Sequence, residues 1–181
     1  MAPERDKILN AEDTAVATKV LRDTHALMPD CRWALQTRVR IVRILLVEDS
    51  KPILRENEAA LHRAGYEVIC AADGEGALEM ATTQKPDLIL LDMILPKISG
   101  PDVLGRLKSD PATAAIPVVV LSSLSAKNRQ KLLEAGAEEY LEKNSLMPAR
   151  GVNLLPIKLE NIICRIQRRR GVAFSDARTS K

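Results

Sequence analysis

The chain has 181 residues, 46% of them hydrophobic and 28% charged, with a net charge of +3, which predicts one globular domain flanked by additional sequence. No apolar run approaches the roughly 18 residues of a membrane span, and residues 1–10 lack the apolar segment of a secretory signal, so we expect no membrane insertion. The three scattered cysteines, Cys31, Cys70 and Cys164, exclude a disulfide framework and a zinc site and favour a reducing, cytoplasmic location.

Residues 1–40 form a predicted N-terminal extension. Within it, Asn10 can cap a helix over residues 11–28, with Val16, Val20 and Leu27 on one side. Two interpretations of this helix stay open: a partner-binding or dimerisation element, and a weakly ordered extension.

From Ile41 onward, short apolar runs alternate with amphipathic segments, the pattern of a parallel sheet covered by helices. The predicted strands are Ile41–Val47, Tyr66–Ala71, Asp87–Leu91, Pro117–Leu121 and Glu139–Glu142. The predicted helices are Lys51–Ala64, Gly74–Thr82, Pro101–Lys108, Ser125–Ala135 and Pro156–Arg170. Right-handed crossovers then predict a five-stranded, doubly wound α/β domain over residues 41–170, and residues 171–181 are expected to form a flexible tail.

Charge is divided unevenly along the chain. Residues 41–147 carry 12 basic and 16 acidic residues, whereas residues 148–181 carry eight basic and two acidic residues. Arg165 and Arg168–Arg170 fall at the end of the last predicted helix, where they either complement the helix dipole or contact a partner. Four aromatic residues and a single arginine cluster argue against direct binding of nucleic acid.

Polar residues follow several of the predicted strands, at the edge where open parallel sheets bind ligands. They are Glu48, Asp49, Asp92, Ser122 and Lys143. Three neighbouring carboxylates repel one another, and a hard divalent cation such as Mg²⁺ relieves that repulsion while leaving room for phosphate oxygens. With a lysine opposite the metal, the implied chemistry is in-line transfer of a phosphoryl group to Asp92, which gives an aspartyl phosphate.

Four segments in this order and spacing resemble the receiver domain of two-component response regulators. They are Ile44–Ser50 (ILLVEDS), Asp87–Gly100 (DLILLDMILPKISG), Ile116–Ser123 (IPVVVLSS) and Gly136–Lys143 (GAEEYLEK). The resemblance implies the flavodoxin-like receiver fold with strand order 2-1-3-4-5. Together with the short flanking sequences, it suggests a stand-alone, single-domain protein of the chemotaxis-regulator type.

The resemblance also implies roles for individual residues. Asp92 corresponds to the phosphoacceptor. Its phosphoryl group would come from a histidine kinase or a histidine phosphotransfer protein. Glu48 and Asp49 correspond to the acidic pair that holds Mg²⁺, with Asp49 as the direct ligand, and Asp92 and the backbone carbonyl of Ile94 complete the site. Lys143 corresponds to the lysine that pairs with the acceptor or its phosphate.

Further correspondences concern the switch. Ser122 matches the hydroxyl that moves toward the phosphoryl group, Tyr140 matches the aromatic residue that turns inward with it, and Gly100 matches the glycine of the loop after the acceptor. Output is then expected from binding a separate protein target through residues 125–142 and 156–170, with a homodimer as a further possibility.

The sequence departs from the family pattern after Lys143 and at Ser122, which replaces the commoner threonine but keeps a workable hydroxyl. Asn144 stands where the family usually has a proline after the lysine, which leaves the geometry of this long loop open. Ile94 and Leu124, two positions after the acceptor and the switch serine, are apolar and flank the path of attacking water, so we expect at most slow self-dephosphorylation and no enzyme activity beyond it.

Three other functions compete with this interpretation. A Mg²⁺-dependent phosphohydrolase with Asp92 as nucleophile needs a second acid where Ile94 stands. A flavin or nucleotide binder needs a phosphate-binding loop where Glu48 and Asp49 stand. A receiver fold that binds its partner independently of phosphorylation stays open, although the full set of polar residues makes it the weaker hypothesis.

Overall fold

The computed structural model describes residues 42–123, 128–146 and 153–169. The predicted extension at residues 1–40, with its helix, and the predicted tail at residues 171–181 lie outside this part of the chain. Among the described helices, none combines the length and apolar character that a bilayer crossing requires.

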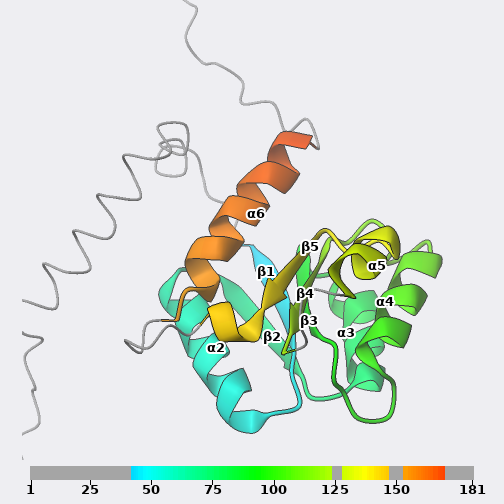
Figure 1. Ribbon diagram of the computed structural model, residues 1–181, viewed down its shortest axis with the longest axis horizontal. Coiled ribbons are helices and arrows are strands. Elements are labelled where there is room, and N and C mark those ends of the chain that lie inside the picture. Colours follow the sequence, from blue (N-terminus) through cyan, green and yellow to red (C-terminus); the bar gives the residue numbers. More distant parts are fainter. Residues whose placement is uncertain (1–41, 124–127, 147–152, 170–181) are drawn as a thin grey trace, which may run out of the picture. The chain divides into compact units, whose positions relative to one another are not determined.

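Five parallel strands form one sheet in the order β2-β1-β3-β4-β5 (Figure 1). In chain order they are β1 (Arg43–Val47), β2 (Glu67–Ala71), β3 (Leu88–Asp92), β4 (Val118–Ser122) and β5 (Glu139–Glu142). This topology confirms the predicted doubly wound sheet and its strand order. Every residue of β3 and β4 is buried, which explains their nearly continuous apolar sequences.

Two of these strands end one residue later than predicted. The predicted ends were Leu91 and Leu121, whereas β3 ends at Asp92 and β4 at Ser122. Asp92 lies in register with Leu121, and Ser122 lies in register with Glu142. An apolar run marks only where side chains are buried in a core, whereas the backbone ladder continues into polar residues at the edge of the sheet.

Helices cover both faces of the sheet. They are α2 (Lys51–Arg63), α3 (Gly74–Gln84), α4 (Gly100–Ser109), α5 (Arg129–Glu134) and α6 (Leu155–Arg169). Helices α2 and α6 pack on one face, and α3, α4 and α5 pack on the other (Figure 1). The predicted helix Ser125–Ala135 is described only from residue 128 onward, because residues 124–127 lie outside the described part.

Strand β1 shows how the sheet builds two cores. Leu45 and Val47 point to the face covered by α3 and α4, while Ile44 and Leu46 point to the face covered by α2 and α6. All four side chains are fully buried, and each such burial contributes roughly 1.5–3 kcal/mol of transfer free energy. Because all five strands are parallel, their carboxyl ends meet at one edge, where the polar residues predicted from the sequence gather.

Candidate functional site

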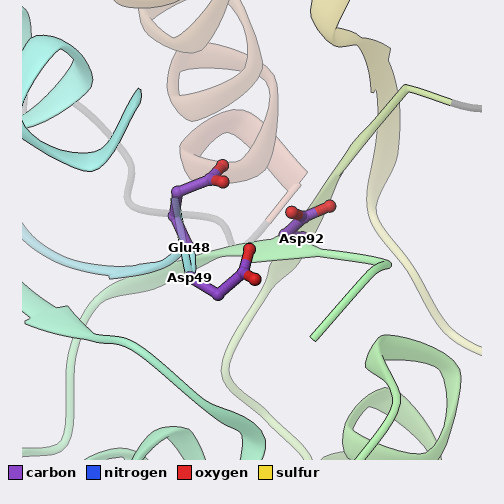
Figure 2. Close-up of side chains that lie close together, drawn as sticks. All are labelled: Glu48, Asp49 and Asp92. Atoms are coloured by element: carbon purple, nitrogen blue, oxygen red, sulfur yellow. The ribbon is translucent and has the colours of Figure 1, made fainter. Parts of the chain in front are cut away.

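Three carboxylates meet at the carboxyl edge of the sheet. Glu48 and Asp49 directly follow β1, and Asp92 is the last residue of the neighbouring strand β3. One carboxylate oxygen from each residue lies within 4.8 Å of the others (Figure 2). The structure therefore brings together the acidic cluster that the sequence predicted.

The three acids differ in their exposure to solvent. Glu48 and Asp92 retain only 1% and 3% of their accessible surface, whereas Asp49 is exposed. Two of the three carboxylates are thus buried, and only Asp49 faces the solvent. Carboxylate oxygens that are open to solvent on one side are suitable ligands for a hard, partly hydrated divalent cation such as Mg²⁺.

Lys143 lies immediately after β5 and bridges two of these acids. Its Nζ atom donates to Oδ2 of Asp92 and to Oε2 of Glu48, each at 2.6 Å. The sequence predicted the contact with Asp92 but missed the contact with Glu48, which was expected to serve the metal alone. The sequence placed both residues at the same edge of the sheet, but strand ends alone do not show which of the three acids the lysine contacts.

Burial and ion pairing set the electrostatics of this site. Burial raises the pKa of Glu48 above its usual value, and the hydrogen bond from Lys143 offsets that shift only in part. Burial also acts to lower the pKa of Lys143, but the hydrogen bonds to Asp92 and Glu48 outweigh it and raise that pKa. Lys143 is therefore a cation at neutral pH, and three carboxylates against one ammonium leave negative charge in excess.

Both carboxylate oxygens of Asp92 have defined partners. Oδ1 accepts a hydrogen bond from the backbone amide of Ile94 at 3.2 Å, and Oδ2 accepts the hydrogen bond from Lys143. The loop after β3 and the residue after β5 thus fix the orientation of this side chain. A preoriented carboxylate saves the entropic cost of placing a nucleophile.

Gly100 makes the close packing behind Asp92 possible. A Cβ atom at this position would lie 2.3 Å from the backbone oxygen of Asp92 and 2.5 Å from Cα of Met93. The Gly100 amide donates to the carbonyl of Met93 at 3.2 Å, which closes the base of the loop. Only glycine leaves room for the first turn of α4 against the end of β3.

The remaining predicted residues differ in how deeply they are buried. Ser122, the last residue of β4, is 1% exposed, and Tyr140 of β5 is buried in the core that underlies α3, α4 and α5. Ile94 is 56% exposed and is the only large hydrophobic residue in the described chain with an exposed side chain. Leu124 lies outside the described residues.

The chain after the site forms a short 3₁₀ helix, η3, over Lys143–Ser145. The Leu146 amide donates to the Lys143 carbonyl at 3.0 Å, and the Ser145 hydroxyl donates to the Glu142 carbonyl at 2.8 Å. Asn144 therefore sits in a turn of helix directly after β5. The following residues 147–152 lie outside the described part.

Two of the basic residues near the end of the chain form ion pairs that the sequence did not reveal. Arg165 Nη2 lies 2.8 Å from Oε2 of Glu139, and Arg169 Nη1 lies 2.8 Å from Oε1 of Glu138. Arg129 of α5 contacts the same Glu139 at 2.9 Å through Oε1. Two of the four arginines that the sequence had assigned to the helix dipole or to a partner, Arg165 and Arg169, thus pair with acids at and just before the start of β5.

Comparison with known protein families and proteins gives concordant matches. A family model described as the response regulator receiver domain matches residues 44–150. The gliding motility regulatory protein of Myxococcus xanthus is 44% identical over 123 residues, which cover 67% of this chain and 15% of that protein. Response regulator PleD of Caulobacter vibrioides is 44% identical over 102 residues, which cover 56% of this chain and 22% of PleD. The chain therefore spans only a small part of these relatives.

Solved structures give the same answer. The receiver domain of the sensor histidine kinase PA1611 from Pseudomonas aeruginosa PAO1, with a magnesium ion coordinated in its active site cleft, has a TM-score of 0.57 and 31% identity, covering 69% of this chain and 96% of that chain. The chemotaxis response regulator CheY4 of Vibrio cholerae has a TM-score of 0.56 and 29% identity, covering 71% and 98%. The chain belongs to the family of response regulator receiver domains, the family that its sequence motifs resemble.

Proposed function

We propose that this protein is a phosphorylation switch in which Asp92 accepts a phosphoryl group from the phosphohistidine of a histidine kinase or a histidine phosphotransfer protein. The observation that carries the proposal is that Asp92 contacts two different kinds of group. Its carboxylate belongs to the acidic cluster with Glu48 and Asp49, and it also accepts a hydrogen bond from Lys143 at 2.6 Å. A nucleophile between a cation site and an ammonium group is suited to a dianionic phosphoryl group with three exposed oxygens.

Mg²⁺ is the cofactor that fits this cluster. Asp49, Asp92 and the backbone carbonyl of Ile94 would hold it, and Glu48 would contribute from its position beside Lys143. When bound, the ion supplies positive charge that neutralises phosphoryl oxygens. The magnesium ion in the cleft of the PA1611 receiver domain supports this assignment.

The chemistry at Asp92 is a simple in-line displacement. A carboxylate oxygen of Asp92 forms a bond to phosphorus while the bond from phosphorus to the donor imidazole nitrogen breaks, and the imidazole retains the electron pair of that bond. Lys143 faces the acceptor and stabilises the transferred charge through its ammonium group. The Ile94 amide and Lys143 hold the carboxylate in place, so little reorganisation precedes transfer.

Phosphorylation then shifts the chain between two conformations that exist beforehand. In this proposal the Ser122 hydroxyl binds the phosphoryl group, Tyr140 moves with it, and the changed surface over residues 125–142 and 156–170 binds a separate protein target. Receiver domains in general bind kinases and downstream effectors, which supports this assignment. The stand-alone organisation, the homodimer and the cytoplasmic location stay predictions.

Phosphotransfer from a panel of histidine kinases tests the proposal. Acetyl phosphate is tested beside the kinases as a small phosphoryl donor. Each reaction contains Mg²⁺ and one form of the protein, either the wild type, Asp92→Asn or Asp102→Asn. We expect labelling of the wild type and of Asp102→Asn, whose exposed acid lies in the first turn of α4, and none of Asp92→Asn. Labelling that survives in Asp92→Asn would refute the acceptor. A wild type that no donor labels would support a binding module that works without phosphorylation.

A further inference from the structure

The loop between β3 and α4 contains an unusual turn. The Ile98 amide donates to the Pro96 carbonyl at 2.8 Å, and the residue between them, Lys97, has a φ of 65°. A bond across one residue with positive φ is the pattern of the classic γ-turn, which is rare and strained. Lysine gains nothing from this conformation by itself, so other contacts must hold it there.

Two carboxylates at the start of α3 provide such contacts. Lys97 Nζ lies 2.7 Å from Oδ2 of Asp73 and 3.0 Å from Oε2 of Glu75. Asp73 also caps α3, because its Oδ1 accepts a hydrogen bond from the Gly76 amide at 2.8 Å. One carboxylate thus serves both the helix and the loop. The hydrogen bond from Lys97 is also the main reason why the pKa of Asp73 lies below its usual value.

A second observation brings the same loop against α3. A Cβ atom on Gly74, the first residue of α3, would lie 2.7 Å from the backbone oxygen of Ile98 and 2.8 Å from its Cβ. The backbone of the loop therefore rests directly on the first turn of the helix. Together with the ion pairs of Lys97, this packing fixes the far end of the loop to an element outside the acidic cluster.

The near end of this loop reaches the site itself. The Ile94 amide donates to Oδ1 of Asp92 at 3.2 Å, and the Ile94 carbonyl is the proposed ligand of Mg²⁺. The Gly100 amide closes the loop on the Met93 carbonyl at 3.2 Å. A loop of this length, held at its base and at its turn, has few ways to move Ile94 while both attachments persist.

We propose that Lys97 is a positioning residue whose ion pairs with Asp73 and Glu75 hold the loop after β3, and with it the Ile94 carbonyl, in the conformation that binds Mg²⁺ for phosphoryl transfer. The inference rests on the proposed function of the site. It assigns to the start of α3 a part in metal binding, although neither Asp73 nor Glu75 belongs to the acidic cluster that faces the metal.

The charge of Lys97 and its proposed positioning role predict opposite effects on the affinity for Mg²⁺. Replacing Lys97 with a neutral residue removes a positive charge near a cation site, which by Coulomb's law favours Mg²⁺. Loss of positioning instead weakens Mg²⁺ binding. Lys85 supplies a matched control, since it also has a positive φ, 46°, and caps the other end of α3.

The experiment titrates the 181-residue chain with Mg²⁺ by calorimetry for the wild type, Lys97→Gln, Lys97→Arg and Lys85→Gln. For Lys97→Gln we expect the Kd for Mg²⁺ to rise roughly two- to fivefold, the range set by exposed ion pairs. Lys97→Arg keeps the ion pairs and retains the wild-type Kd, and Lys85→Gln leaves the Kd unchanged. Hydrogen exchange gives an independent readout, with faster exchange at the Ile98 amide in Lys97→Gln alone.

Labelling by acetyl phosphate separates this inference from the proposed function. In Lys97→Gln the rate should fall at low Mg²⁺ and recover at saturating Mg²⁺. Mg²⁺ binding by Lys97→Gln that is as tight as in the wild type, or tighter, overturns the inference even if Asp92 is labelled normally. A wild type that binds Mg²⁺ but is not labelled contradicts only the proposed transfer, whereas a wild type that binds no Mg²⁺ contradicts both.

Discussion

Lys143 and Glu48 illustrate how single residues shape this site. The Glu48 side chain is almost entirely buried and has its negative charge beside two other acids, an arrangement that is costly without a cation. The Lys143 ammonium supplies that cation in the absence of metal and at the same time orients Asp92. One lysine thereby pairs with Glu48 and orients Asp92, the proposed acceptor.

Ile94 is the residue that should govern the lifetime of the phosphoryl group. Its exposed apolar side chain follows Asp92 by two positions and offers water no hydrogen bond. We expect the double variant Ile94→Asn, Leu124→Glu to lose its phosphoryl group roughly tenfold faster, the effect of one added hydrogen bond of about 1.4 kcal/mol in the transition state. The decay of labelled protein after removal of the donor measures this, and an equal or longer half-life in the variant contradicts it.

At the level of secondary-structure elements, the close packing of α4 against the end of β3 requires that residue 100 has no Cβ atom. Gly100→Ala places a methyl group 2.3 Å from the Asp92 backbone oxygen, so either α4 or the end of β3 must shift. We expect a loss of about 1–3 kcal/mol in the free energy of unfolding, measured with denaturant, and slower labelling of Asp92.

Gly105 in the same helix is the matched control. A Cβ atom there meets nothing within 4 Å, so Gly105→Ala should raise the free energy of unfolding by about 0.5–1 kcal/mol through helix propensity. Equal effects of the two substitutions would mean that the close packing behind Asp92 carries no special role.

Glu139 joins three elements, because it lies on β5 and pairs with Arg129 of α5 and Arg165 of α6. Burial acts to raise the pKa of this carboxyl, but hydrogen bonds from Arg129, the Tyr140 amide and Arg165 outweigh it and lower the pKa below the ordinary value of 4.5. The ionised form is thus favoured in the folded state. Its contribution is present above pH 4.5 and is lost as the pH falls through the lowered pKa.

Thermal or denaturant unfolding at several pH values measures this contribution. Glu139→Gln should cost about 0.5–1 kcal/mol at pH 7, and this cost should shrink as the pH falls from 4.5 through the lowered pKa. The control is Glu138→Gln, which removes a carboxylate with a single arginine partner, Arg169. A cost of Glu139→Gln that stays constant across the acid range would show that the ion pairs are not its source.

The sequence predicted the elements better than the contacts between them. Uninterrupted apolar runs identified the central strands, and the parallel arrangement then brought Asp49, Asp92 and Lys143 to one edge. The bond from Lys143 to Glu48 and the ion pairs of Lys97 were missed, because side chains far apart in sequence leave no periodic signal. The one-residue extension of β3 to Asp92 was missed for a related reason, since backbone pairing does not require an apolar residue.

For the whole molecule, the acidic cluster lowers the stability of the folded state without Mg²⁺ while providing the proposed metal site. The single ammonium of Lys143 does not balance three acids at one edge, and Mg²⁺ should relieve their remaining repulsion by binding only the folded state. Mg²⁺ at ten times its Kd should raise the free energy of unfolding by about 1.4 kcal/mol.

Unfolding with and without Mg²⁺ measures this stabilisation. Asp49→Asn should be more stable than the wild type without Mg²⁺ and should gain little on its addition, because it lacks a ligand and a repelling charge. Asp102→Asn, which lies outside the cluster, should respond like the wild type. A full response of Asp49→Asn to Mg²⁺ would contradict the proposed metal site.

Transfer of the phosphoryl group to Asp92 is the step on which the proposed function depends. It is tested most directly by exposing the protein to acetyl phosphate and Mg²⁺, reducing any acyl phosphate with borohydride, and locating the resulting homoserine by mass spectrometry of peptides. We expect homoserine at position 92 alone, dependent on Mg²⁺ and absent in Asp92→Asn. Homoserine at Asp49 or another aspartate, 5-hydroxynorvaline at Glu48 or another glutamate, or no reduced residue while labelling persists would contradict this assignment.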